Sequence, residues 1–227
     1  MSFDLVLFAL GGVLVDSERP AAEARAEALA GAGLPVSADE LLEDFPGQST
    51  KEVLLRLEKR AHAPIRATLI AEADAQVAAR LSRDVKPVAG AREALAALGG
   101  RYCTVSDEPL ERARAMLGAA ELLPPLEGRI FAAPDLKLKP RPSTDLFRFV
   151  VEKTGVKPAR CFAVEASAAG IAAAKATGMR AVGFSGASHA FPGLADRLTD
   201  AGAETVLRRL ADLTGVLTAL AEWSEEI

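Results

Sequence analysis

The sequence predicts an α/β protein, in which an all-helical cap domain is inserted into a doubly wound parallel sheet. Three observations support this fold class. A short apolar run, 5–8, is typical of a buried strand, and Gly11-Gly12 interrupts the chain soon after it. The segment 18–83 shows only helical patterns, whereas strand and helix patterns alternate after it. We therefore expect a core of residues 1–17 and 84–227, and a cap of residues 18–83.

Composition argues against several classes of protein. The chain has 227 residues, of which 50% are hydrophobic, and this is enough to bury a sizeable core. The formal charge is −4 and the basic residues are scattered, so we expect no nucleic-acid partner. No apolar run reaches the roughly 18 residues that cross a bilayer, so we expect no membrane partner. Cys103 and Cys161 lie in apolar strand-like runs and are interpreted as core residues, which favours a reducing, cytoplasmic location.

Helix-capping residues set the expected helices of the cap. Ser17 is the expected N-cap of a first helix that includes 21–32. Ser37 and Glu40 have the spacing of a capping box, which predicts the start of a second helix. A third helix, with apolar residues at helical spacing, is expected to have Thr50 as its N-cap. The remaining boundaries are the loop 46–49, the helix-breaking Pro64 and a fourth helix, 67–81.

The elements after the cap alternate between strand and helix. This order predicts a parallel sheet with helices on both faces, because parallel strands need crossover connections. The expected strands are 101–105, 129–132, 160–164, 179–184 and 204–207, and the expected helices are 108–117, 145–154, 168–177 and 210–223.

The stretch 4–18 carries the first of four motifs. It reads Asp-Leu-Val-Leu-Phe-Ala-Leu-Gly-Gly-Val-Leu-Val-Asp-Ser-Glu. It resembles the Phe-Asp-x-Asp-Gly-Val-Leu-Val-Asp-Ser-Glu motif of the haloacid dehalogenase-like hydrolases, in their phosphatase and β-phosphoglucomutase branch. The resemblance implies a Rossmann-like core, a helical cap and Mg²⁺-dependent phosphoester chemistry. The family's nucleophile, which also binds the metal, falls at Ala9, and its general acid/base falls at Gly11.

The second motif of this family is a Ser or Thr at the end of the second core strand, where it donates a hydrogen bond to the phosphoryl group. Ser106 fits by position and type, although a serine can also serve only to satisfy the end of a strand. Asp107 follows it, beside the expected phosphate position. A carboxylate there would repel a dianion, and Asp107 could equally be the N-cap of the next helix.

The third motif is a Lys that neutralises the phosphate and pairs with the nucleophile. The family's Gly-Lys-Pro-x-Pro-Asp resembles Leu-Lys-Pro-Arg-Pro-Ser-Thr-Asp at 138–145, with two extra residues before the Asp. Lys139 is the first choice because Pro follows it. Arg141 is the alternative if the register is counted backward from Asp145.

The fourth motif is a pair of acids that holds Mg²⁺ at the end of a later strand. In the matching stretch, 164–171, the first acid is Glu165 and the second position is Ala166. Glu165 would be a vestige of the metal site, and Ala166 would mark a lost ligand. We therefore expect no cofactor to bind tightly, although active relatives use Mg²⁺, and we expect the chain to fold well without it.

In the cap, the loop Gly47-Gln48-Ser49 resembles the family loop that leans over the active site and helps to select the substrate. The expected ligand is a small phosphorylated metabolite or another anion, and an additional protein partner is left open. The expected ligand-binding residues are Gly47, Gln48, Ser49, Ser106, Asp107 and Lys139.

The missing acids lead to three interpretations. In the first, the chain has lost the family's phosphatase activity and keeps its pocket or a surface for binding. In the second, it is an active hydrolase or phosphomutase that uses substitute carboxylates such as Asp107, Asp16 or Glu165. In the third, the acids were removed from an ordinary phosphatase by design or by sequence error, since each difference from Asp is a single-base change. The first interpretation is preferred, because the charge losses coincide with the positions that the chemistry needs.

Overall fold

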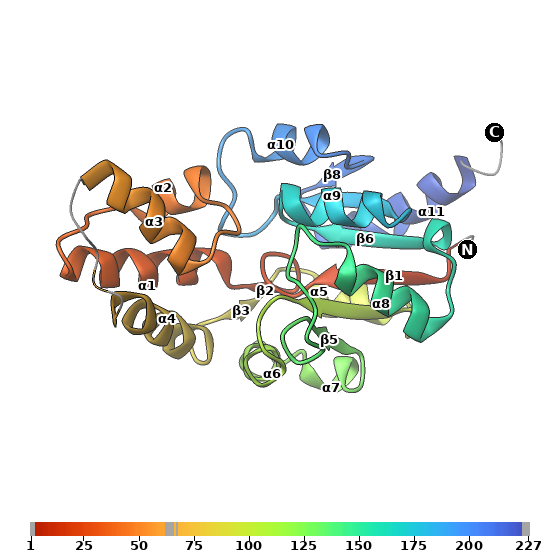
Figure 1. The fold of residues 1–227 in the computed structure, drawn as a ribbon. Coiled ribbons are helices and arrows are strands. Elements are labelled where there is room, and N and C mark those ends of the chain that lie inside the picture. Colours follow the sequence, from red (N-terminus) through yellow and green to blue (C-terminus); the bar gives the residue numbers. More distant parts are fainter. Residues whose placement is uncertain (1–2, 62–65, 67, 224–227) are drawn as a thin grey trace.

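The computed structural model describes residues 3–61, 66 and 68–223, and it confirms the predicted α/β fold (Figure 1). One sheet of parallel strands has the order β5-β4-β1-β6-β7-β8. The strand predicted first, β1, lies inside the sheet between β4 and β6. The strands are β1 (Leu5–Ala9), β4 (Tyr102–Ser106), β5 (Ile130–Ala132), β6 (Cys161–Glu165), β7 (Arg180–Phe184) and β8 (Thr205–Leu207).

Helices cover both faces of this sheet. Successive side chains of a strand point to opposite faces, and those of β1 are apolar on both. Val6 and Phe8 belong to the apolar cluster of one face, together with residues of α5, α6 and α11. Leu5 and Leu7 belong to the cluster of the other face, together with residues of α8, α9 and α10. These helices are α5 (Ala91–Ala97), α6 (Leu110–Ala119), α8 (Asp145–Thr154), α9 (Ala168–Ala176), α10 (Leu194–Asp200) and α11 (Leu213–Trp223), and the short α7 is Leu123–Leu126.

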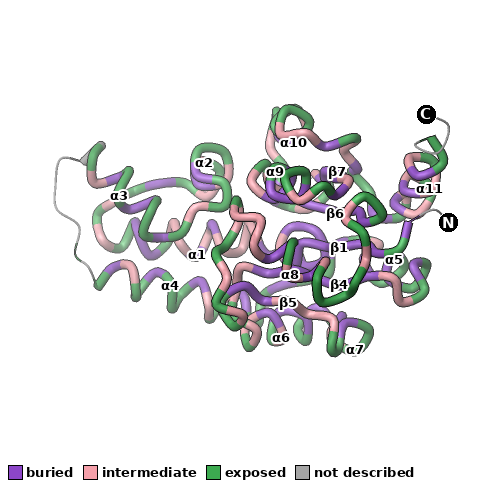
Figure 2. The backbone as a smooth tube through the Cα atoms, turned by 45° about the vertical axis from the view of Figure 1, so that its right-hand side comes forward, coloured by how far each residue is buried: buried purple, intermediate pink, exposed green. Residues whose placement is uncertain are grey.

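Four further helices lie beyond one end of the sheet, and they have an apolar cluster of their own (Figures 1 and 2). The two segments that connect the core with these helices lie side by side, because β2 (Val15–Asp16) pairs with β3 (Lys86–Pro87). This pairing supports the proposed division into a core and a helical cap. The four helices are α1 (Glu18–Gly31), α2 (Ala38–Asp44), α3 (Thr50–Ala61) and α4 (Thr68–Leu81).

Capping contacts confirm the N-cap at Ser37, leave Ser17 in its predicted position without a capping hydrogen bond, and correct the N-cap predicted at Thr50. The Ser37 hydroxyl accepts a hydrogen bond from the Glu40 backbone N–H, as the capping box predicts. Ser17 holds the N-cap position of α1, but its side chain makes no capping hydrogen bond. Thr50 is the wrong cap, because Ser49 exchanges hydrogen bonds with Glu52 at the start of α3.

Cys103 and Cys161 are buried and free, as expected of core residues. Pro64, the predicted end of the third helix, lies outside the described residues. Among the helices that the structure describes, none is long and apolar enough to cross a membrane.

Candidate functional site

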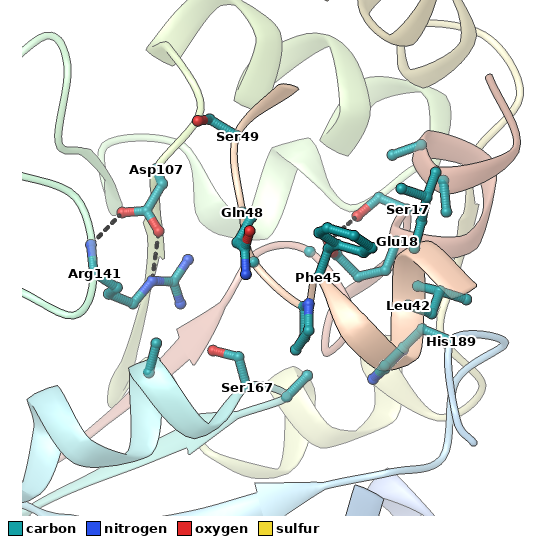
Figure 3. A pocket seen from close by; sticks show the side chains of 18 of the residues that line it. Ser17, Glu18, Leu42, Phe45, Gln48, Ser49, Asp107, Arg141, Ser167 and His189 are labelled. Atoms are coloured by element: carbon teal, nitrogen blue, oxygen red, sulfur yellow. Dashed lines mark hydrogen bonds and ion pairs between the residues drawn. The ribbon is translucent and has the colours of Figure 1, made fainter. Parts of the chain in front are cut away.

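A cavity of about 810 Å³ opens where the carboxyl ends of β1, β4 and β6 face the cap helices. Parallel α/β sheets bind their ligands at this end. Figure 3 shows side chains from both parts of the chain around the cavity. Of the predicted site residues, Gly11, Gly47, Gln48, Ser49, Ser106, Asp107, Glu165 and Ala166 line it.

The end of β1 brings no carboxylate of its own to the cavity. Ala9 is the last residue of the strand and is buried, and Gly11 lies at the cavity wall. Glu18, the first residue of α1, fills the space above Gly11. A Cβ on Gly11 would collide with the Glu18 carboxylate and would lie 2.7 Å from the Ser17 hydroxyl oxygen.

The Arg141 side chain occupies the side of the cavity between β4 and β6. Its Nη1 donates to both carboxylate oxygens of Glu165, at 2.8 and 2.7 Å, and its Nε donates to Asp107 Oδ2 at 2.7 Å. The Arg141 backbone N–H also donates to Asp107. These three residues form an ion-pair cluster, which we call the Arg141 cluster.

Glu165 and Arg141 are almost closed to solvent, whereas the third member of the Arg141 cluster, Asp107, has a side chain that is 33% exposed. The side chain of Glu165 is 1% exposed and that of Arg141 is 14% exposed. Burial raises the pKa of Glu165, and the charge of Arg141 only partly offsets this. Burial alone would lower the pKa of Arg141, but the charges of Glu165 and Asp107 outweigh it, so this pKa is raised. Arg141 therefore stays charged, and its removal would leave a buried acid without a counter-charge.

The structure brings Arg141, the alternative choice, to this site in place of Lys139. Lys139 is exposed and does not line the cavity, and its backbone N–H donates to Asp145. The physical reason is the path of the loop 139–144. Along this loop the Lys139 side chain is exposed, whereas the Arg141 side chain reaches the carboxylates of Glu165 and Asp107.

Ser106 stands at the end of β4, as predicted, but its hydroxyl is engaged within its own loop. The Ser106 Oγ accepts from the Glu108 backbone N–H at 3.0 Å and donates to the Glu108 carbonyl at 3.3 Å. Glu108 itself lines the cavity and pairs with Arg112. Burial raises the pKa of Glu108, and Arg112 partly offsets the shift.

Three further residues that line the cavity were given no role by sequence reasoning. Glu18 belongs to the first motif, and Arg25 lies two helical turns later on the same face of α1. Arg25 Nε donates to the Thr50 hydroxyl, and burial lowers its pKa. His189, on the loop after β7, is buried, and burial lowers its pKa. The helical spacing could have singled out Arg25, but no sequence signal points to His189.

The described residues do not fit a Mg²⁺ site. Mg²⁺ is held by carboxylates together with water and substrate oxygens. Glu165, the one expected ligand that remains, accepts hydrogen bonds from Arg141 on both carboxylate oxygens. In the described part of the chain, no three His, Cys, Asp or Glu side chains gather closely enough to hold a metal ion.

Comparison with known families and structures gives a consistent result. Residues 3–178 match the model of a hydrolase family, described as haloacid dehalogenase-like hydrolase. A conserved haloacid dehalogenase-like protein of unknown function from Agrobacterium tumefaciens is 42% identical, with a TM-score of 0.90 over 96% of this chain and 99% of that one. No curated protein matches the chain.

Two other similar structures contain ligands. A haloacid dehalogenase family hydrolase from Deinococcus radiodurans, with bound phosphate and sodium, is 30% identical, with a TM-score of 0.82 over 97% of each chain. CbbY from Rhodobacter sphaeroides is 23% identical, with a TM-score of 0.70 over 93% of this chain and 96% of that one. A mutant of CbbY was solved in complex with xylulose-(1,5)bisphosphate.

Proposed function

The chain belongs to the haloacid dehalogenase-like hydrolase family, and from this premise we propose that it binds a small molecule without hydrolysing phosphoesters. The Arg141 cluster carries this proposal. The guanidinium lies between Glu165 and Asp107, so it supplies the positive charge that a metal ion would otherwise bring to these acids.

The end of β1 supports the same proposal. Attack on a phosphoryl group needs an activated nucleophile, and the family's route needs an acid/base next to it. Ala9 offers a methyl group and Gly11 offers no side chain. Loss of a hydrolase's nucleophile costs about 10⁶ in turnover where it has been measured. We therefore expect the chain to have no phosphatase activity of the family's type.

The alternative, catalysis through substitute carboxylates, finds no support in the described contacts. Asp107 and Glu165 both pair with Arg141. Asp16 accepts hydrogen bonds from the Ser188 hydroxyl and backbone N–H. Phosphoester turnover that disappears in Asp107→Ala would instead support this alternative.

Retention of the cavity argues for a binding role. Its walls keep Gln48, Ser49 and Phe45 from the cap, opposite the ends of the sheet strands (Figure 3). The similar proteins from Deinococcus and Rhodobacter hold phosphate or a sugar bisphosphate. We infer that the ligand of this chain is also a small molecule that binds between the core and the cap.

The test is a turnover assay with Mg²⁺, an aryl phosphate and a panel of sugar phosphates. Three proteins are compared: the native chain, the triple variant Ala9→Asp/Gly11→Asp/Ala166→Asp, and this triple variant with Arg141→Lys added. We expect no turnover in the native chain. Because Arg141 donates hydrogen bonds to both carboxylate oxygens of Glu165, we expect the fourfold variant to be more active than the triple variant. Clear turnover in the native chain would overturn the proposal.

A further inference from the structure

The side of the cavity away from Arg141 holds polar groups that have few partners. Figure 3 shows Ser17, Glu18 and His189 on this side, and Asp107 and Arg141 on the other. All five residues line the cavity. We call Ser17, Glu18 and His189 the His189 group.

Two members of the His189 group meet at the backbone of Gly12. A Cβ on Gly12 would lie 3.2 Å from Glu18 Cγ and 3.2 Å from His189 Cε1. The Glu18 carboxylate also lies above Gly11, where it accepts a hydrogen bond from the Ser17 hydroxyl at 3.1 Å. Segments far apart in the sequence therefore place a carboxylate, a hydroxyl and an imidazole around the end of β1.

The imidazole of His189 is buried and has no hydrogen-bond partner in the described part of the chain. The residue is 5% exposed, and among the described residues neither Nδ1 nor Nε2 has a partner. A neutral imidazole carries one donor and one acceptor. Since the large majority of buried polar atoms in proteins are hydrogen-bonded, two such atoms in a cavity wall indicate a place for a ligand.

The other charged residues near His189 are engaged elsewhere. Asp16 accepts from Ser188, and Arg19 pairs with Asp39. Glu18 forms no ion pair within the described part of the chain, and its described hydrogen bond comes from the neutral Ser17 hydroxyl. The His189 group therefore combines one carboxylate that forms no described ion pair with several acceptor atoms.

We propose that the His189 group binds the primary ammonium group of a small organic ligand. The ammonium has three N–H donors and one positive charge. The Glu18 carboxylate, the unprotonated nitrogen of His189 and the lone pairs of the Ser17 hydroxyl offer matching acceptors. The negative charge of Glu18 would attract this cation. The inference rests on the proposed binding function, and it names the ligand chemistry that the cavity selects.

The probe is ethylammonium chloride, and the readout is the imidazole NMR spectrum. The chain has two histidines, so a His62→Gln variant assigns the His189 signals. We expect a saturable shift of these signals with ethylammonium, and none with ethanol or with potassium chloride at equal ionic strength. We expect Glu18→Gln to weaken binding by at least about tenfold, because it removes a charged hydrogen-bond partner.

Glu52→Gln is the matched control, since Glu52 also lines the cavity but is bound to Ser49. It should leave ethylammonium binding unchanged. His189→Phe is a second variant, and it should weaken the binding of ethylammonium when followed by calorimetry. Absence of a saturable shift, an equal response to ethanol, or full binding by Glu18→Gln would each overturn the proposal. Phosphoester turnover is a separate measurement, so failure of the proposed function is distinguished from failure of this inference.

Discussion

The two sides of the cavity differ in how their charges are satisfied. In the Arg141 cluster, one guanidinium pairs with two carboxylates at 2.7 Å each. In the His189 group, Glu18 has no described ion-pair partner and the imidazole has no described hydrogen bond. A self-satisfied cluster stabilises a fold and leaves little for a ligand, whereas unsatisfied groups gain partners when a ligand binds. The Arg141 cluster therefore has a structural role, and the His189 group is the side that we propose to bind a ligand.

Removal of Arg141 is expected to have the largest effect on stability. Arg141→Met leaves Glu165 buried without its counter-charge, and breaking a buried pair in this way costs about 3–5 kcal/mol of unfolding free energy. Urea unfolding measures the change. Lys139→Met is the control, because Lys139 is exposed, and it should change stability by less than about 0.5 kcal/mol. Similar losses in both variants would contradict the structural role of the cluster.

The Gly170→Ala variant is expected to have the next largest effect on stability. A Cβ there would collide with the Glu165 carboxylate, which Arg141 holds in place. Such overpacking costs about 1–3 kcal/mol. Gly118→Ala in α6 is the control, because nothing lies within 4 Å of its Cβ position. It should gain about 0.5–1 kcal/mol, since Ala favours a helix. Thermal or urea unfolding that shows the same sign for both variants would contradict this arrangement.

His189 should make a smaller, pH-dependent contribution to the free energy of unfolding. Burial lowers the pKa of His189, and Arg19 adds to this effect, whereas Glu18 and Asp16 oppose it. Below the ordinary histidine pKa of about 6.5, the unfolded chain therefore binds a proton more readily than the folded one. The resulting stabilisation is complete above that pH and is lost as the pH falls toward the lowered pKa.

The difference in unfolding free energy between the native chain and His189→Phe isolates this contribution from that of the carboxylates. We expect the difference to change between pH 7.5 and pH 5, with the native chain losing stability relative to the variant. A constant difference would mean that His189 titrates normally in the folded state.

Much of the fold could be predicted from local sequence, because periodicity and capping are local properties. The helix 145–154 has the predicted bounds, and the apolar run at 5–8 is the main part of β1. The pairing of β2 with β3 was missed, because each strand has only two residues and too little sequence to show a pattern. Ser49 was missed as the N-cap of α3 because the adjacent Thr50 is also a residue type that commonly caps helices.

The site was less predictable than the fold. The motifs predicted Gly11, Ser106 and Glu165 as site residues, and all three line one cavity. They meet there because the ends of parallel strands lie at one edge of the sheet. The choice between Lys139 and Arg141 depends on the path of a proline-rich loop, which residue spacing does not define. His189 lies on a loop far along the chain from β1, and no local sequence pattern indicates that it lines the same cavity.

The melting temperature with and without Mg²⁺ tests the central claim most directly. If the Arg141 guanidinium takes the place of a metal ion, millimolar Mg²⁺ should leave the melting temperature of the native chain unchanged, with or without inorganic phosphate. The variant that carries Ala9→Asp, Gly11→Asp, Ala166→Asp and Arg141→Lys should be stabilised by Mg²⁺, because a metal that binds only the folded state raises its stability. A marked rise for the native chain would show that it holds Mg²⁺, and would contradict the claim.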